Sequence, residues 1–212
     1  MHNTINNLEN IKNKLVNYPK AKIIAVSKTF NQEHIVPLLD YGHKDFGENK
    51  IQEALQKWPS LKEKYTDIKL HMIGKLQTNK VKFALKIFDY IHSLDSEKLA
   101  NKIADEQQKH KKKPKIFIQV NMGNEEQKSG IDKRNLNDFY KFCKNLNLYI
   151  IGTMCIPPND GNTKKYFSEM SDINKELNFK ELSMGMSGDY LEAIRYNATY
   201  VRVGSKIFGS RT

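Results

Sequence analysis

Short apolar runs alternate with segments of helical periodicity along this 212-residue chain, and this alternation restricts the fold more than any other feature. We predict a helix over residues 4–17, followed by eight strand–helix units. Strands that alternate with helices pair in parallel, because each crossover helix returns the chain to the same end of the sheet. Eight units in one uninterrupted chain favour a closed (β/α)8 TIM barrel over an open sheet. The predicted fold class is therefore α/β, a single barrel with an additional N-terminal helix.

The positions of these elements follow from the apolar pattern. Strands are predicted near residues 23–28, 45–47, 69–73, 90–93, 116–120, 148–153, 181–184 and 200–203. Helices are predicted near residues 35–39, 51–58, 78–87, 96–108, 136–143, 166–177 and 190–196, with a short turn at 205–208. Ser93 or Asp95 is expected to cap the helix that begins at Ser96. Barrels of this kind need roughly 200 residues, so we expect one domain, residues 1–212, with few insertions.

The composition is that of a globular protein, with 39% hydrophobic and 28% charged residues. No apolar run approaches the roughly 18 residues that cross a bilayer, and the N-terminus lacks a signal-peptide pattern. The 2 cysteines, Cys143 and Cys155, form neither a disulfide framework nor a metal motif. We therefore expect a cytoplasmic protein with no metal site and no membrane contact.

The net charge of +11 raises the alternative of nucleic-acid binding. However, the lysines are spread along the whole chain, and the densest group, residues 109–115, enters a predicted strand through Pro114. We interpret this group as a solvated loop on the face opposite the carboxyl ends of the strands. A nucleic-acid binder would also need aromatic side chains clustered among the lysines, and none stands out. We expect no nucleic-acid partner.

Lys28 stands at the end of the first predicted strand, where active sites of (β/α)8 barrels are built. An apolar strand beneath it would desolvate its amine. Burial disfavours the ammonium form and frees the amine as a nucleophile toward carbonyl compounds. The alternative from this stretch alone is a lysine that begins a surface loop.

Two glycine- and serine-rich segments follow the last two strands, residues 184–188 and Gly204-Ser205. Barrels of this class often bind phosphate there, because glycine lets the backbone approach the anion and a helix N-terminus donates amides to it. The alternative is that these glycines serve tight turns. Because the two segments lie at the ends of adjacent strands, together they favour a phosphate site.

Arg202 adds a second charge beside this segment. Strand alternation places Val201 and Val203 under the outer helices and Arg202 inside the barrel, where an unpaired guanidinium is very costly. It therefore needs an acidic partner or a ligand acceptor. Together, a strand-end lysine, a phosphate site and an inward arginine suggest pyridoxal 5'-phosphate (PLP). Because arginine keeps its proton, it would leave the ring nitrogen of PLP largely unprotonated and the cofactor a weaker electron sink.

Other polar residues and glycines are expected at the same face because they follow predicted strands. They are Gly47, Glu48, Asn49, Gly74, Gln77, Asn79, Lys80, His92, Ser93, Asp95, Asn121, Lys128, Ser129 and Gly130.

These motifs make the chain resemble the pyridoxal phosphate homeostasis proteins, single-domain relatives of the alanine racemase N-terminal barrel. The resemblance covers nearly the whole chain and rests on ordered segments at residues 25–29, 46–53, 71–80, 121–130, 182–189 and 201–209. It implies a single alanine-racemase-N-terminal-like barrel domain, with PLP held as a Schiff base on Lys28. It also implies phosphate contacts from Ser187, Gly204 and Ser205, Arg202 near the ring nitrogen, and Asn49 near the ring.

Two positions depart from the pattern of the family. Leu70 stands where an aromatic residue is common, and Asn197 replaces a frequent glycine. Asparagine tolerates the left-handed conformation that ends a helix, so we expect the fold to be kept.

The resemblance implies a protein that buffers or delivers PLP within the cell, with PLP-dependent apoenzymes as possible recipients. The alternative is a weak or vestigial PLP-dependent amino-acid racemase. Racemisation needs an acid/base group on each face of the substrate carbon, and only Lys28 is identified here. We therefore expect no robust catalytic activity and no catalytic residues, and we expect a monomer. A further hypothesis gives Lys128 a transient hold on PLP during hand-over, against the alternative of a surface lysine.

Overall fold

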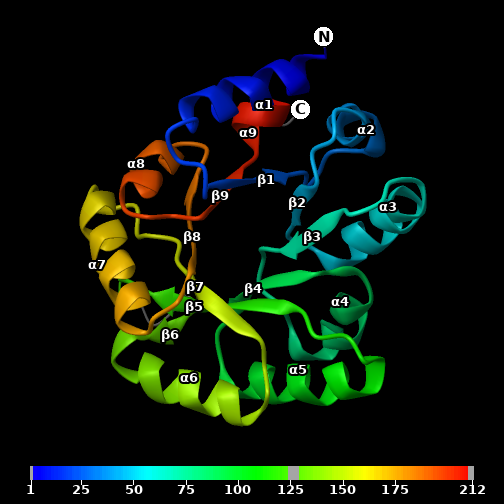
Figure 1. The fold of residues 1–212 in the computed structure, drawn as a ribbon. Coiled ribbons are helices and arrows are strands. Elements are labelled where there is room, and N and C mark those ends of the chain that lie inside the picture. The colour runs from blue at the N-terminus through cyan, green and yellow to red at the C-terminus, as the bar shows by residue number, and fades with distance from the viewer. Residues whose placement is uncertain (1, 124–128, 210–212) are drawn as a thin grey trace.

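The protein is a parallel barrel surrounded by helices (Figure 1). The structure, a computed structural model, describes residues 2–123 and 129–209. Its sheet has the strand order β4-β3-β2-β1-β9-β8-β7-β5-β6, and a further pairing of β4 with β5 closes the ring. The strands are β1 Lys22–Val26, β2 Asp45–Glu48, β3 Lys69–Met72, β4 Tyr90–Leu94, β5 Lys115–Asn121, β6 Ile131–Asp132, β7 Ile150–Met154, β8 Glu181–Met186 and β9 Tyr200–Val203. The predicted closed (β/α)8 barrel is confirmed.

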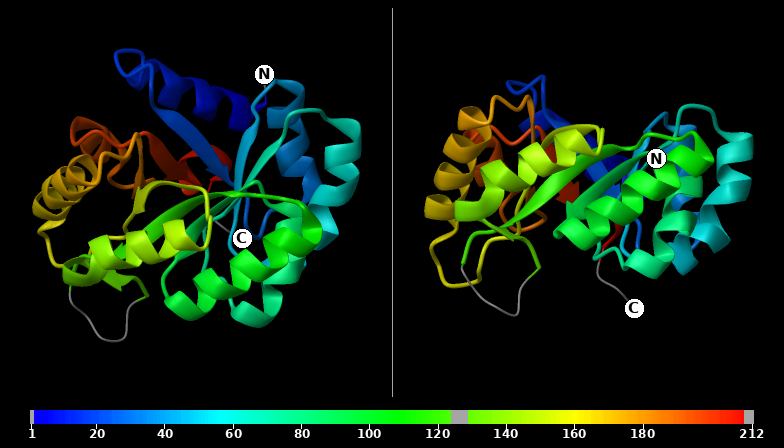
Figure 2. Two further views of the ribbon diagram at one scale, coloured as in Figure 1. Left: turned by 60° about the horizontal axis from the view of Figure 1, so that its bottom comes forward. Right: turned by 90° about the horizontal axis from the view of Figure 1, so that it is seen from below.

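Helices lie around the outside of the strands, as the views in Figure 2 show. They are α1 Asn3–Lys14, α2 Gln32–Asp40, α3 Ile51–Lys64, α4 Val81–Ile87, α5 Glu97–His110, α6 Leu136–Asn145, α7 Thr163–Glu176, α8 Tyr190–Arg195 and α9 Ser205–Phe208, with 3-10 turns at Thr78–Lys80 and Lys133–Asn135. No helix among residues 2–123 and 129–209 is long and apolar enough to cross a membrane.

The first and last strands of the barrel pair with each other. In this pairing Ile24 lies opposite Arg202, and Ala25 lies opposite Val203. Helices α1 and α9 lie side by side over this seam (Figure 1), and the side chain of Asn7 donates a hydrogen bond to the Ile207 carbonyl at 2.9 Å. The predicted N-terminal helix is thus present and packs against the last helix of the chain.

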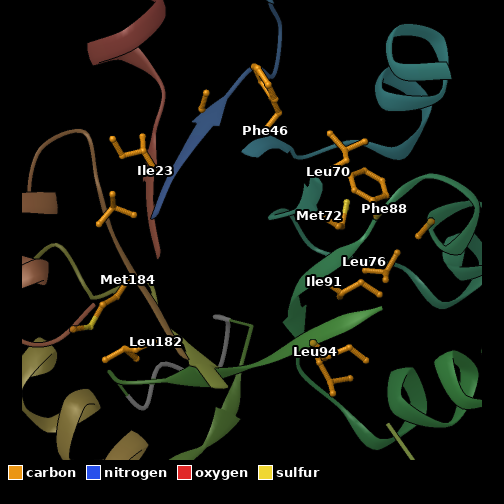
Figure 3. Packing of buried hydrophobic residues seen from close by; sticks show 14 of the residues in the cluster. Ile23, Phe46, Leu70, Met72, Leu76, Phe88, Ile91, Leu94, Leu182 and Met184 are labelled. Carbon is orange, nitrogen blue, oxygen red and sulfur yellow. The ribbon is translucent and has the colours of Figure 1, made fainter. Parts of the chain in front are cut away.

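Strand alternation divides the buried side chains into two groups. One group lies between the strands and the helices; Figure 3 shows members of it, including Ile23, Leu70 and Met184. Leu70, which departs from the family pattern, is fully buried there. The other group fills the barrel interior: Ile24, Tyr90, Phe117, Met154 and Tyr200. Arg202 has the same parity as Tyr200 along β9, so it points inward, as predicted.

Several local predictions needed correction. β6 was not expected, and it pairs with β5 outside the closed ring. The first helical residues of segment 78–87 form a 3-10 turn. Asn197 is left-handed, with φ 67°, as expected for a residue that replaces glycine.

The predicted cap of α5 was wrong. Ser93 is buried within β4, which continues to Leu94, so it cannot cap the helix. Instead Ser96 has an extended backbone, and its hydroxyl oxygen accepts a hydrogen bond from the Leu99 amide at 3.3 Å. The cap therefore lies next to the first helical residue, Glu97, where the unpaired amides are.

This cap can be tested by substitution. Replacing Ser96 with alanine is expected to lower the free energy of unfolding by about 1 kcal/mol, because it removes the acceptor at the N-terminus of α5. Urea denaturation of the purified protein measures this loss. Ser168→Ala, within α7, is the control and should cost little, because alanine is a good helix former. Equal losses in both variants would contradict the assignment.

Candidate functional site

Lys28 lies on a tight turn immediately after β1. The strand ends at Val26, two residues earlier than predicted, and Lys28 is half-buried. The Phe30 amide donates to the Ser27 carbonyl at 3.2 Å and closes the turn. Thr29 has φ 69°, in the left-handed region that β-branched residues rarely adopt. A conformation of this kind persists only where surrounding groups hold it.

Two residues of α3 hold this turn. The Thr29 amide donates to the Glu53 carboxylate at 2.5 Å. The Lys57 ammonium donates to the carbonyls of Ser27 at 2.9 Å and Phe30 at 3.0 Å, and to Glu53 at 2.8 Å. These contacts fix the backbone on both sides of Lys28, so α3 determines where the Lys28 side chain begins.

Glu48, the last residue of β2, completes the arrangement beneath the turn. It is fully buried, and one carboxylate oxygen accepts from Ser27 at 2.8 Å and Trp58 at 3.0 Å. The Lys57 ammonium lies 2.8 Å from the same oxygen. Burial raises the pKa of Glu48, and its contacts with Lys57, Trp58 and Ser27 act against this rise. Lys57 therefore stabilises a carboxylate that would be costly if left alone.

A cavity of about 480 Å³ opens at the carboxyl ends of the strands next to this turn. All six predicted cofactor-binding residues line it: Lys28, Asn49, Ser187, Arg202, Gly204 and Ser205. The other lining residues are Val26, Phe30, Ile73, Ile156, Met186, Gly188 and Gly209. The structure thus brings the predicted residues together, in a cavity that is apolar on one side and bears hydroxyl, amide and cationic groups on the other.

The Ser187 and Gly204 segments form one corner of this cavity. The Gly204 amide donates to the Ser187 hydroxyl at 3.1 Å, which joins the ends of β8 and β9. The turn after β8 is fixed because the Met186 amide donates to the Asp189 carboxylate at 2.6 Å. α9 begins at Ser205, and the first amides of a helix have no partner within it. This corner therefore offers a hydroxyl group and backbone amides to an anion.

Glycine is required at two positions around the site. At Gly185, with φ 90°, a Cβ would lie 2.5 Å from the Ala193 Cβ. At Gly74, a Cβ would lie 2.4 Å from the Asn49 carbonyl oxygen. The close approach of Gly74 to the backbone of Asn49 places Asn49 at the cavity.

Arg202 is buried beneath the cavity, and its partners are neutral. Its guanidinium donates to the Ser183 hydroxyl at 2.7 Å and to the Cys155 carbonyl at 2.9 Å. Within the described part of the chain it forms no ion pair with a carboxylate. Burial lowers its pKa, and Cys155 and Asp189 act in the opposite direction. Of the two kinds of partner expected from the sequence, the acidic side chain is not found among the described residues, and Arg202 lines the cavity.

Several other residues expected at this face do not line the cavity. His92 and Ser93 are buried within β4, and the Nδ1 atom of His92 lies 2.9 Å from the Ser183 hydroxyl inside the barrel. A separate depression is lined by several further predicted residues, namely Gln77, Asn79, Asp95, Ser129 and Gly130. Lys128 lies outside the described residues.

Sequence reasoning missed the roles of Glu53, Lys57 and Ser183. Glu53 and Lys57 are four residues apart on one helix, a spacing that brings their side chains together. That spacing could have indicated an ion pair, although not the turn that it supports. Ser183 gave no such signal, because its partners come from distant strands.

The donor set suits a small aromatic aldehyde with an anionic group. Lys28 supplies a primary amine, Arg202 a fixed cation, and Ser187 with the Gly204–Ser205 segment a group of donors. Val26, Phe30 and Ile73 supply apolar walls for a ring. No cluster of three or more His, Cys, Asp or Glu residues suitable for a metal ion occurs among the residues that the structure describes. The residues therefore fit PLP.

Comparison with known proteins gives a consistent result. The sequence model of the family described as "Alanine racemase, N-terminal domain" matches residues 1–212. A pyridoxal phosphate homeostasis protein of Aquifex aeolicus is 38% identical over 201 residues, which cover 90% of this chain and 87% of the relative. A protein of the same name from Synechocystis is 38% identical over 203 residues, covering 91% and 93% of the two chains.

Solved structures agree with the fold. PipY of Synechococcus elongatus, solved with PLP bound, has a TM-score of 0.90 and 32% identity over 97% of this chain and 100% of its own. The alanine racemase of Clostridium difficile has a TM-score of 0.76 at 18% identity, with 99% of this chain and 57% of that chain covered. The similarity to the alanine racemase, at 18% identity, shows a shared fold only.

The support of the Lys28 turn by Lys57 leads to a stability prediction. Lys57→Met is expected to lower the free energy of unfolding by about 3–5 kcal/mol, because Glu48 is left buried without its cation. The double variant Lys57→Met/Glu48→Gln should recover part of this loss. Lys102→Met, which removes a more exposed partner of Glu106, should cost less than about 1 kcal/mol. Urea denaturation measures all three, and equal effects at Lys57 and Lys102 would contradict the assigned role.

Proposed function

The chain belongs to the pyridoxal phosphate homeostasis proteins of the alanine racemase N-terminal domain family, and we propose on this basis that it binds PLP and buffers or delivers it within the cell. The observation that carries the proposal is the convergence of six predicted residues on one cavity. These residues come from the ends of β1, β2, β8 and β9, so their proximity is a property of the closed barrel.

We propose the following binding mode. Lys28 holds PLP as a Schiff base, since its amine lies at the cavity and its turn is held by Glu53 and Lys57. Ser187, Gly204 and Ser205 bind the phosphate at the corner where β8 and β9 end. Asn49 lies near the ring.

Arg202 is proposed to face the ring nitrogen. PLP supplies an electron sink whose strength depends on protonation of that nitrogen. A guanidinium keeps its proton, so Arg202 can donate a hydrogen bond to the nitrogen but does not protonate it. This chain's own residues thus hold the cofactor without strengthening its electron-withdrawing capacity, which favours storage and delivery over catalysis.

The proposal extends to the recipients of the cofactor, the oligomeric state of the protein and its compartment. PLP-dependent apoenzymes are the recipients of the cofactor, because a carrier needs acceptors that lack it. The protein acts as a monomer. It is placed in the cytoplasm because Cys143 and Cys155 are both buried free thiols, which are typical of a reducing compartment.

The Schiff base can be tested by chemical trapping. Borohydride reduction of the protein with PLP, followed by peptide mass spectrometry, is expected to give a pyridoxyl adduct on Lys28. The adduct and the visible absorption of bound PLP should be lost in Lys28→Ala. Lys50→Ala, an exposed lysine next to Asn49, is the matched control and should retain both. An adduct that persists unchanged in Lys28→Ala would overturn the assignment.

The phosphate corner can be tested with a ligand that lacks phosphate. Ser187→Ala is expected to weaken PLP binding about tenfold, the effect of one hydrogen bond to a charged group. Binding of pyridoxal should change less than about twofold, because this ligand has no phosphate for Ser187 to contact. Fluorescence titration gives both dissociation constants. A similar loss for the two ligands would show that Ser187 does not contact the phosphate.

A further inference from the structure

A continuous series of hydrogen-bonding side chains runs through the barrel beneath the cavity. Its first link is Arg202 to Ser183. The Ser183 hydroxyl lies 2.9 Å from His92 Nδ1, and His92 Nε2 lies 2.9 Å from His71 Nδ1. His71 Nε2 lies 3.1 Å from a carboxylate oxygen of Asp45, the first residue of β2. The series therefore connects the carboxyl end of β9 with the amino end of β2.

Aromatic rings of the barrel interior hold both imidazoles in place. His71 stacks on Tyr90 with 4.1 Å between ring centroids, and His92 stacks on Phe117 at 4.3 Å. Tyr200 lies against both histidines. His71, His92 and Ser183 are fully buried, and none of their polar atoms lacks a partner. Rings packed in this way cannot turn freely, so each nitrogen keeps one partner.

The Asp45 end fixes the direction of the hydrogen bonds. An ionised carboxylate can only accept, so His71 Nε2 must carry a proton. If His71 is neutral, its Nδ1 atom accepts, and His92 must donate from Nε2. His92 Nδ1 then accepts from the Ser183 hydroxyl, whose oxygen accepts from Arg202. Each group donates to the next, from Arg202 to Asp45, and each imidazole nitrogen has one partner.

The charges around the series favour this state. Burial lowers the pKa of His71, although the hydrogen bond and charge of Asp45, with the charge of Asp89, act against it, while Lys69 adds to the lowering. Burial, His71 and Arg202 together hold the pKa of His92 well below its usual range. For Asp45, burial acts to raise the pKa, but the hydrogen bond and charge of His71, together with the charges of Lys69 and His43, outweigh this and the pKa is lowered. At neutral pH the histidines are therefore neutral and Asp45 is ionised.

We propose that Asp45, His71, His92 and Ser183 are positioning residues that orient Arg202 toward the ring nitrogen of the cofactor through a one-directional hydrogen-bond series with both histidines in the Nε2–H form. This inference rests on the proposed place of Arg202 at the ring nitrogen. The series keeps the Ser183 hydroxyl proton directed at His92. The lone pairs of its oxygen are thereby available to Arg202, and the guanidinium cannot rotate away from the cavity without losing its acceptor.

The first experiment needs no cofactor. Long-range proton–nitrogen NMR correlation of the imidazole rings in the apo protein at neutral pH distinguishes the two neutral tautomers from the imidazolium. Both His71 and His92 are expected as Nε2–H. An Nδ1–H form of either ring, or a protonated His71, would reverse or interrupt the series and overturn the proposal. Failure of PLP to bind at all would leave these spectra unchanged, so the two failures are distinguishable.

The second experiment measures the effect on Arg202. Ser183→Ala and His92→Phe are expected to weaken PLP binding about tenfold, as for the loss of one hydrogen bond to a charged group. His92→Gln should restore binding to within about twofold, because an amide keeps an acceptor on one atom and a donor on the other. His110→Gln, at an exposed histidine at the end of α5 and outside the series, is the control.

An analogue of PLP with carbon in place of the ring nitrogen separates positioning from general damage. Its affinity should be nearly the same for the wild type, Ser183→Ala and His92→Gln, since it offers Arg202 no acceptor. Equal weakening of PLP and the analogue in Ser183→Ala would mean that the residue supports only the fold, and the proposal would be wrong. Circular dichroism melting of each variant identifies any that do not fold, and Ser183→Ala and His92→Phe each provide the test without the other.

Discussion

The rest of the site depends on one costly requirement, a permanent cation inside the barrel. Arginine cannot give up its proton to reduce the cost of burial, as a lysine or histidine would. Its charge must therefore be met by oriented oxygens, and Ser183 and the Cys155 carbonyl supply them from two neighbouring strands. Neutral acceptors leave the charge of Arg202 uncompensated toward the cavity. A ligand with a lone pair or negative charge would find there a guanidinium that no carboxylate among the described residues neutralises.

A buried ion pair organises the turn that carries Lys28. Lys57 connects Glu48, Glu53 and two carbonyls of the turn that carries Lys28. The polar contacts of Lys57 and those of Arg202 are structurally independent, because the first belong to α3 and the turn after β1 and the second to the barrel interior. The Lys28 turn and the Arg202 guanidinium are therefore each held by their own set of contacts, while Ile156 and Met186, which also line the cavity, are exposed.

The sequence was sufficient for the fold and for six residues that line one cavity. Alternation of apolar segments indicated the barrel, and the parity of Tyr200-Val201-Arg202-Val203 placed Arg202 inside it. It was not sufficient for the partners of Arg202, because Ser183 and Cys155 become neighbours only through the register of three strands. His92 was misplaced for a related reason. β4 continues to Leu94, so a residue expected beyond the strand end lies within the interior. The pairing of residues on neighbouring strands depends on the stagger of the closed sheet. The apolar periodicity of a single strand gives no information about that stagger.

The pairing of β1 with β9 has a consequence for the newly made protein. Lys28 leaves the ribosome well before Arg202, Gly204 and Ser205, which lie more than 170 residues later in the chain. Domains generally fold as units during synthesis, and this seam cannot form until β9 is available to close it. A chain made only as far as β8 thus contains Lys28 but lacks Arg202, Gly204 and Ser205, which line the same cavity. The complete lining of the cavity forms only after β9 has been made.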